Sequence, residues 1–121
     1  MNRQLAEARG RRAETIAAWW LRLRGWRILA QRVRVTGGEV DLVARRGRVL
    51  AFVEVKQRAT DEAADWSLDE YRLRRVAVAA QRPTSRYARD GDDVRIDALF
   101  IVPRRLPRHL PNVWHGGQAT R

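Results

Sequence analysis

Two predicted strands at residues 37–58, GGEVDLVARRGRVLAFVEVKQR, constrain the fold of this chain more than any other feature. The second strand, residues 49–56, is apolar on both faces until its last positions. Such a strand belongs in the middle of a sheet that is covered on both sides. Glu54 and Lys56 therefore lie on one face at the end of a buried strand, a costly place for charges unless a cation or a substrate uses them.

In the first strand of this pair, residues 39–44, side chains alternate with the two-residue period of a strand: Val40, Leu42 and Ala44 alternate with Glu39, Asp41 and Val43. Arg46-Gly47 supplies the turn, because Gly47 can adopt positive φ. If the strands pair as a hairpin about Gly47, Asp41 and Glu54 approach closely enough to share a ligand. Lys56 is the single lysine among 25 lysine and arginine residues. Since lysine is a compact point charge and arginine a planar fork, this choice favours a site that needs a point donor.

Composition excludes several classes of site. The 121 residues suffice for one domain with a real core, and no cysteine is present for a disulfide, a thiolate zinc site or a cysteine nucleophile. The net charge of +11 is spread along the chain and favours polyanions, of which nucleic acid is the commonest. The alternative is that an Arg- and Ala-rich composition reflects codon bias and solubility. With no long apolar segment, we expect a soluble cytoplasmic protein without a membrane partner.

The patterns predict one domain over residues 1–102 and a C-terminal tail over 103–121 that wraps it, with Val113 and Trp114 docking and the end disordered. A mobile loop is expected at 59–66, at the mouth of the site. The domain is expected to contain the following elements in order: a helix from residue 2 or 3 to 24 that Gly25 ends, strands at 26–35, 39–44 and 49–56, a helix at 68–81 and a strand at 94–102.

Two further acidic residues lie on predicted elements. Glu14 is at the edge of the apolar stripe of the first helix, and from its position alone the simpler interpretation is a surface glutamate paired with Arg11 or Arg12. Asp97 lies inside the last strand. We expect it to anchor that strand through an arginine or a backbone donor.

The element order, with Asp41 followed after twelve residues by Glu54-Val55-Lys56, resembles the PD-(D/E)xK nuclease superfamily. Nearly the whole chain resembles the YraN family, small bacterial proteins of predicted endonuclease-like fold. The resemblance implies an α/β fold with an αβββαβ restriction-endonuclease-like core and a mixed sheet of about four strands flanked by helices. It is carried by Glu14, GEVD at 38–41, FVEVK at 52–56, RID at 95–97 and RHLPN at 108–112.

This resemblance also implies a site and its chemistry. Asp41, Glu54 and the Val55 carbonyl would hold Mg²⁺ or Mn²⁺, and Glu14 would complete the metal shell. Lys56 would position the attacking water or stabilise charge on the phosphate. At Arg72 relatives often carry a lysine, so contact with a phosphate is expected there rather than chemistry. The candidate nucleic-acid contacts are Arg11, Arg12, Arg72, Arg74 and Arg75.

Three functions remain open from the sequence. The first is a metal-dependent nuclease acting on phosphodiesters, for example in branched or damaged DNA, with DNA expected before RNA and a homodimer as one arrangement. The second is a nucleic-acid-binding module that keeps the fold but cleaves poorly or only with a partner. The third is a buried ion-pair network, which would be destabilising unless every group is satisfied.

Overall fold

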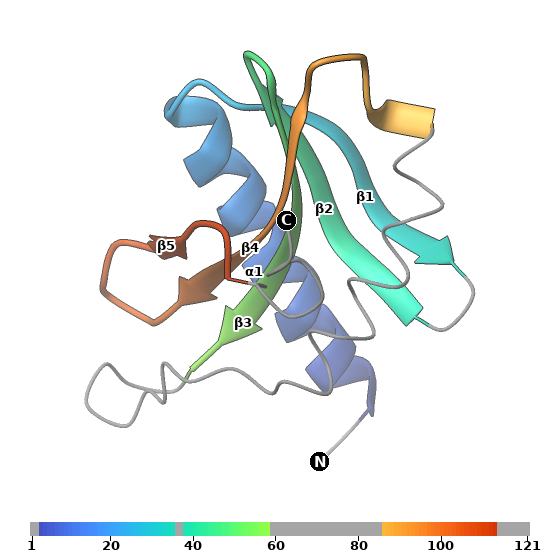
Figure 1. Ribbon diagram of the computed structural model, residues 1–121. Coiled ribbons are helices and arrows are strands. Elements are labelled where there is room, and N and C mark those ends of the chain that lie inside the picture. The colour runs from blue at the N-terminus through green and yellow to red at the C-terminus, as the bar shows by residue number, and fades with distance from the viewer. Residues whose placement is uncertain (1–2, 36–37, 59–85, 114–121) are drawn as a thin grey trace.

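The computed structural model describes residues 3–35, 38–58 and 86–113, without the side chains of residues 3–9, 35 and 38. The predicted helix at 68–81, the predicted loop at 59–66 and Trp114 lie outside the described residues. Figure 1 labels the elements that the structure describes, which are α1 (Arg3–Leu23), β1 (Arg27–Val35), β2 (Gly38–Arg46), β3 (Val49–Gln57), β4 (Asp93–Ile101) and β5 (Arg108–Leu110).

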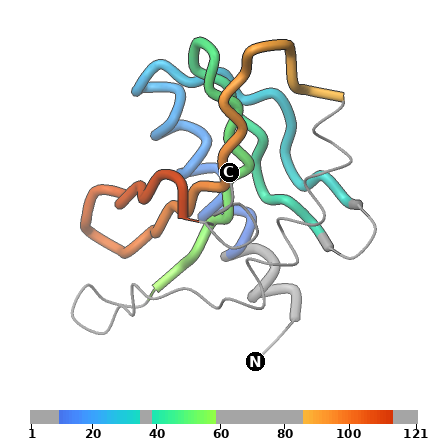
Figure 2. The backbone as a smooth tube through the Cα atoms, in the orientation of Figure 1, coloured from blue at the N-terminus to red at the C-terminus, as the bar shows by residue number. Residues whose placement is uncertain are grey.

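The strands form one mixed sheet in the order β1-β2-β3-β4-β5. β1, β2 and β3 follow one another as antiparallel neighbours, and the chain then returns as β4, parallel to β3 (Figure 2). Gly47 has φ +61 in the β2–β3 turn, which confirms the predicted hairpin. β3 is thus an inner strand, and its residues from Leu50 to Glu54 are buried. That burial follows from its apolar character on both faces.

The end of α1 is fixed by a Schellman motif at Gly25, which has φ +92. Its amide donates to the Arg22 carbonyl at 3.1 Å, and the Trp26 amide donates to the Leu21 carbonyl at 3.0 Å. Leu21 and Trp26 both belong to the core cluster beneath the helix. The prediction that Gly25 ends the helix is confirmed, and the motif turns the chain so that Trp26 packs back on the sheet.

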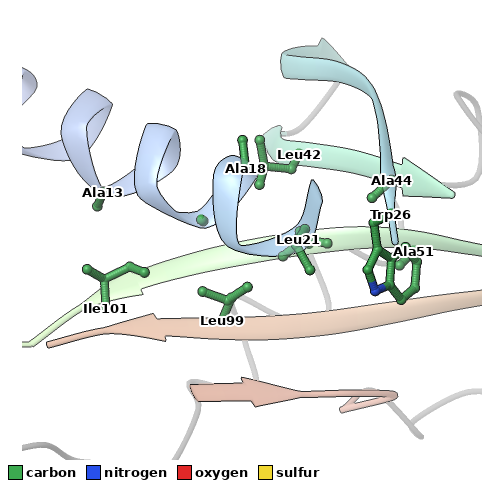
Figure 3. Packing of buried hydrophobic residues seen from close by; sticks show 11 residues of the cluster. Ala13, Ala18, Leu21, Trp26, Leu42, Ala44, Ala51, Leu99 and Ile101 are labelled. Carbon is green, nitrogen blue, oxygen red and sulfur yellow. The ribbon is translucent and has the colours of Figure 1, made fainter. Parts of the chain in front are cut away.

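Helix α1 covers one face of the sheet with small side chains, which allow a close approach. Figure 3 places Ala13 above Ile101, which pairs with Gln57 at the end of β3, while Trp26 lies near Ala51. The N-terminal half of α1 therefore lies over the end of the sheet that carries Glu54 and Lys56. The buried cluster consists of Ala13, Ala17, Ala18, Leu21, Trp26, Leu42, Ala44, Ala51, Val53, Leu99 and Ile101.

A second apolar cluster lies on the other side of the sheet. Phe52 and Val43 are fully buried there as cross-strand partners on β3 and β2. Val113 packs against this cluster, and its amide donates to the Ile96 carbonyl at 2.7 Å. The predicted docking of Val113 is therefore confirmed. The central strands pack against apolar side chains on both faces of the sheet.

The sheet has one strand more than the sequence predicted. We expected about four strands and an irregular tail, but Arg108–Leu110 pairs with β4 as β5. Three residues are too few to show a period-2 pattern, so the strand is visible only through its partners. Within the described residues, no helix is long and apolar enough to cross a membrane.

Candidate functional site

The candidate site lies where the ladder between β2 and β3 ends. Backbone pairing runs from Arg46 opposite Val49 to Leu42 opposite Val53. One residue further, an Asp41 carboxylate oxygen (Oδ2) accepts a hydrogen bond of 2.8 Å from the Val55 amide. A side chain here takes the place of a carbonyl partner, so the Asp41 carboxylate is held against the backbone of β3 beside Glu54.

Glu54 and Lys56 form an ion pair at this end of β3. The Lys56 ammonium nitrogen (Nζ) lies 3.2 Å from a Glu54 carboxylate oxygen (Oε2), and the two side chains are 14% and 1% exposed. Two carboxylates, Asp41 and Glu54, are therefore buried at neighbouring positions with one ammonium. Burying charges in this way costs free energy unless opposite charges and hydrogen bonds compensate.

Strand alternation places Glu54 on the side of the sheet that carries the second apolar cluster. Val43 and Phe52 are cross-strand partners in the second apolar cluster. Glu54 lies two residues after Phe52 on β3, so the period of two directs it toward that side. On β2 the alternation is interrupted, because Val40 and Val43 both belong to this cluster while Leu42 belongs to the first. The position of Asp41 beside β3 is given by its hydrogen bond to the Val55 amide, and the shared ligand stays a prediction.

Glu14 has a different partner from the one expected. The Arg32 guanidinium (Nε) donates to a Glu14 carboxylate oxygen (Oε1) at 2.6 Å, whereas Arg11 and Arg12 are exposed on α1. The expected pairing of Glu14 with Arg11 or Arg12 is therefore wrong. Arg32 is remote in sequence, eighteen residues from Glu14, and no helical spacing could have indicated it.

Arg32 is the residue of this region that sequence reasoning missed. It lies on β1 with φ +55, a conformation that few non-glycine residues adopt. Its hydrogen bond to Glu14 raises the pKa of its guanidinium, and the charges of Glu39 and Asp41 raise it further. The Arg32 cation therefore bonds the helix glutamate directly and interacts more weakly with the strand aspartate.

The complete metal-ligand set inferred from the family is not assembled. Among the described residues, no group of three or more His, Cys, Asp or Glu side chains is gathered so that it could hold a metal. Asp41 and Glu54 are neighbours on β2 and β3, while Glu14 is bonded to Arg32. Two carboxylates and a carbonyl are nevertheless a donor set that suits Mg²⁺, which keeps several waters.

Asp97 anchors the last strands. The carboxylate is fully buried and accepts bonds from the Arg95 guanidinium at 2.9 and 3.2 Å and from the Asn112 amide at 2.9 Å, while His109 Nε2 lies 2.8 Å from it. Burial opposes ionisation, but the hydrogen bonds from His109, Arg95 and Asn112 outweigh it and lower the pKa of Asp97. The prediction of an arginine or backbone donor is confirmed, since Asp97 has both.

A buried ion pair at the other end of the sheet was also missed. The guanidinium of Arg45 donates to both carboxylate oxygens of Asp92, at 3.0 and 2.6 Å, and to the Tyr87 carbonyl at 3.0 Å. The hydrogen bond from Arg45 lowers the pKa of Asp92 to about 2. This pair ties the end of β2 to the segment before β4, far from Asp41 along the strand, so its role is structural.

Comparison with other proteins agrees with this fold. The model of Uncharacterised protein family UPF0102 matches residues 13–101. A UPF0102 protein of Sphingopyxis alaskensis is 63% identical over 114 residues, which are 94% of this chain and 98% of that protein. A UPF0102 protein of Rhizorhabdus wittichii is 57% identical over 117 residues, covering 96% of this chain and 99% of that protein.

A solved structure shares the architecture. The Holliday junction resolvase Hjc of Archaeoglobus fulgidus matches with a TM-score of 0.56 and 21% identity, over 83% of this chain and 73% of that one. The predicted α/β, endonuclease-like fold is thereby confirmed. With a family model over most of its length and relatives of this identity, the chain belongs to uncharacterised protein family UPF0102, the YraN family.

Proposed function

We propose that this protein is a divalent-metal-dependent nuclease that hydrolyses phosphodiester bonds in nucleic acid. The observation that carries the proposal is the end of the β2–β3 ladder, where Asp41 is fixed by the Val55 amide and buried Glu54 is paired with Lys56. If these charged residues served only to stabilise the fold, apolar residues of similar size could replace them, often without loss of stability. The shared fold with a Holliday junction resolvase supports the same chemistry.

The donor set fits Mg²⁺ or Mn²⁺. Asp41, Glu54 and the Val55 carbonyl are oxygen ligands, and their number leaves room for the waters that Mg²⁺ retains. When bound, the ion would supply Lewis-acid activation of water and of the phosphate. The bond from the Val55 amide keeps one Asp41 oxygen oriented, so the carboxylate does not need to reorganise on binding.

Lys56 would act on the reacting groups. Its side chain lies at the end of β3 and is 14% exposed, and its ammonium lies 3.2 Å from a Glu54 carboxylate oxygen. An ammonium in this position can orient a water for attack or stabilise the negative charge that develops on the phosphate oxygens. Lys56 is the only lysine of the chain, which fits a role that an arginine fork does not meet.

Glu14 would join the metal site only after releasing Arg32. In the structure its carboxylate is held by the Arg32 guanidinium at 2.6 Å. Since the charge of Asp41 also acts on Arg32, the guanidinium and an incoming cation would compete for the same acidic residues. We therefore assign Asp41 and Glu54 as the primary ligands and Glu14 as a conditional one.

The positive charge of the protein is the reason for assigning nucleic acid as the substrate. The net charge is +11, and Arg11 and Arg12 are exposed on α1 near Glu14. Arg72, Arg74 and Arg75 lie outside the described residues and stay candidate backbone contacts. DNA is the substrate we test first, because the structural neighbour is a Holliday junction resolvase.

The proposed homodimer is a separate question. Analytical ultracentrifugation with and without DNA measures the mass of the particle and so tests whether two copies associate.

The decisive experiment is a cleavage panel of single-stranded, duplex, flap and four-way-junction DNA with Mg²⁺ or Mn²⁺. Wild type should cleave at least one substrate, and Asp41→Asn and Glu54→Gln should not. Binding should weaken steeply as salt increases, because neutralised phosphates release counterions. A protein that cleaves nothing, or whose Asp41→Asn variant cleaves as well as wild type, would contradict the proposal.

A second candidate function is a nucleic-acid-binding module that cleaves poorly or only with a partner. The Arg32–Glu14 ion pair favours it, because a cation already neutralises part of the acidic site. This module would bind DNA in a salt-dependent way without responding to metal. Equal melting temperatures with and without Mn²⁺, together with retained DNA binding, would select it over the nuclease.

A further inference from the structure

A cleft of about 390 Å³ lies at the C-terminal end of α1. Two tryptophans and three arginines face it, together with residues of the tail: Trp20, Arg24, Trp26, Arg46, Arg95 and Pro107. Its volume is within the range of small-ligand sites. The Schellman motif builds one wall, because it places Trp26 back under the last turn of α1.

Each guanidinium of the cleft is held over an indole ring. The central carbon of the Arg24 guanidinium lies 5.0 Å from the centroid of the Trp20 ring, and that of Arg46 lies 4.7 Å from the Trp26 ring. Arg46 also donates to the Arg24 carbonyl at 3.3 Å. These contacts limit the motion of side chains that are otherwise costly to order, so the two charges are presented in place.

Of the three arginines, Arg24 and Arg46 have no ion-pair partner among the described residues, whereas Arg95 has one. Arg95 is neutralised by Asp97 at 2.9 Å. Among the residues that the structure describes, no carboxylate lies within 4.0 Å of Arg24 or Arg46 to form an ion pair. A cleft with two unneutralised guanidiniums attracts an anion, and arginine forks match phosphate oxygens.

We propose that this cleft binds one nucleotide unit, with the phosphate on Arg24 and Arg46 and the base or sugar against the indole of Trp20 and the prolines of the tail. Aromatic rings and arginines together are the means by which proteins hold single-stranded nucleic acid. The unit is either a free nucleotide or part of a strand. The assignment uses no metal and no residue of the Asp41 site.

The cleft is separate from the candidate cleavage site. Arg24 directly follows α1, and the helix from Glu14 to its end at Leu23 rises about 13 Å. Arg95 lies beside Ala51 on β3, three residues or about 10 Å before Glu54. If the proposed nuclease function holds, the cleft fixes a strand at a set distance from Asp41. If it fails, the cleft remains a nucleotide site.

The test is binding without metal in an Asp41→Asn background, so that cleavage plays no part. The probes are dAMP, an oligo(dA) strand and inorganic phosphate, and the readout is the indole N–H resonances of the five tryptophans. Trp20→Phe assigns one resonance. Arg46→Gln removes a cleft charge, and Arg34→Gln is the control because it removes an exposed charge at the other end of β1.

Both dAMP and the strand should shift the Trp20 and Trp26 resonances, and Arg46→Gln should weaken binding at least tenfold while Arg34→Gln changes it less than twofold. Tighter binding of the strand than of dAMP identifies a strand as the source of the unit. Tighter binding of dAMP identifies a free nucleotide. Equal losses in the two variants, or inorganic phosphate binding as well as dAMP, would overturn the proposal. Trp20→Leu, which keeps an apolar side chain, should weaken dAMP but not inorganic phosphate.

Discussion

The Asp41 carboxylate accepts a 2.8 Å hydrogen bond from the Val55 amide, one residue beyond the last backbone pair of β2 and β3. Asp41 therefore has two functions that can be separated. One oxygen completes the backbone pairing of β3, and the charge of the group opposes that of buried Glu54. A substitution that keeps the acceptor and removes the charge distinguishes them.

Asp41→Asn should leave the fold intact and abolish the response to metal. The asparagine side-chain oxygen can still accept from Val55, whereas the loss of one negative charge relieves repulsion with Glu54. Wild type should gain about 2.7 kcal/mol of stability when Mg²⁺ exceeds its Kd a hundredfold, because the ion binds only the native state. Thermal unfolding with and without Mg²⁺ or Mn²⁺ measures both effects.

Asp41→Ala is the control for this experiment. It removes the charge and the acceptor together, so the partly buried Val55 amide loses its side-chain partner at a cost of up to about 1–3 kcal/mol. It should therefore be less stable than Asp41→Asn in the absence of metal. If Asp41→Asn keeps the full metal response, Asp41 is not a ligand.

Lys56→Met should lose cleavage and keep binding to nucleic acid. The substitution preserves the length of the side chain but removes the ammonium beside Glu54. We expect a fall in turnover of about 10²–10³-fold, the usual effect of removing one group that stabilises a transition state. Turnover and fluorescence anisotropy on the same DNA separate the two quantities.

Lys56→Arg is the matched variant, because it retains the positive charge and the pairing with Glu54. If the site needs a point donor, Lys56→Arg should be nearly as slow as Lys56→Met while remaining as stable as wild type. Wild-type turnover in Lys56→Met would instead show that the ammonium has only a structural role.

Arg32→Gln should raise the affinity for Mg²⁺ or Mn²⁺. The Arg32 guanidinium holds Glu14 at 2.6 Å, and its removal frees a carboxylate and deletes a cation near Asp41. A tenfold tighter Kd corresponds to about 1.4 kcal/mol. Isothermal titration with Mn²⁺ measures the change directly, without any cleavage assay.

Arg34→Gln is the control for this prediction. Arg34 lies two residues further along β1, is exposed, and faces Glu39 at 3.8 Å. Its loss lowers the net charge by the same amount but leaves the Glu14 pair in place. Identical gains in metal affinity for the two variants would mean that net charge, and not release of Glu14, is responsible.

The central part of the fold could be predicted because its signals are local. Gly25 and Gly47 have the positive φ that their positions in a helix end and a turn require. The apolar stretch of β3 indicated an inner strand, and its burial confirms this. Once these elements are correct, the register pairs Leu42 with Val53 and so brings Asp41 to the end of the ladder beside β3.

The contacts of Arg32 and Arg45 could not be predicted, because they join residues far apart in sequence. Arg32 bonds Glu14 across 18 residues, and Arg45 bonds Asp92 across 47. In a chain with so many arginines, composition does not indicate which guanidinium is buried. β5 was missed for a related reason, since Asp97 and β4 supply its partners and its own sequence has no strand period.

Asp92→Asn should make the acid sensitivity of the fold smaller. In wild type the bidentate contact with Arg45 lowers the pKa of Asp92 from 3.8 to about 2. A carboxyl whose folded-state pKa is lowered stabilises the fold fully above its unfolded pKa. That contribution is lost as the pH falls through the folded value. The free energy of unfolding of wild type should therefore decrease between about pH 4 and pH 2.

Asn at this position has no such titration and leaves the buried Arg45 guanidinium without its counter-charge. The variant should be less stable than wild type at pH 7, and the difference should shrink as the pH falls from 4 to 2. Asp97, whose pKa is also lowered, is present in both proteins, so its contribution cancels in the difference. Urea unfolding at several pH values measures this difference. A difference that stays constant from pH 7 to pH 2 would show that the Asp92 charge does not stabilise the fold.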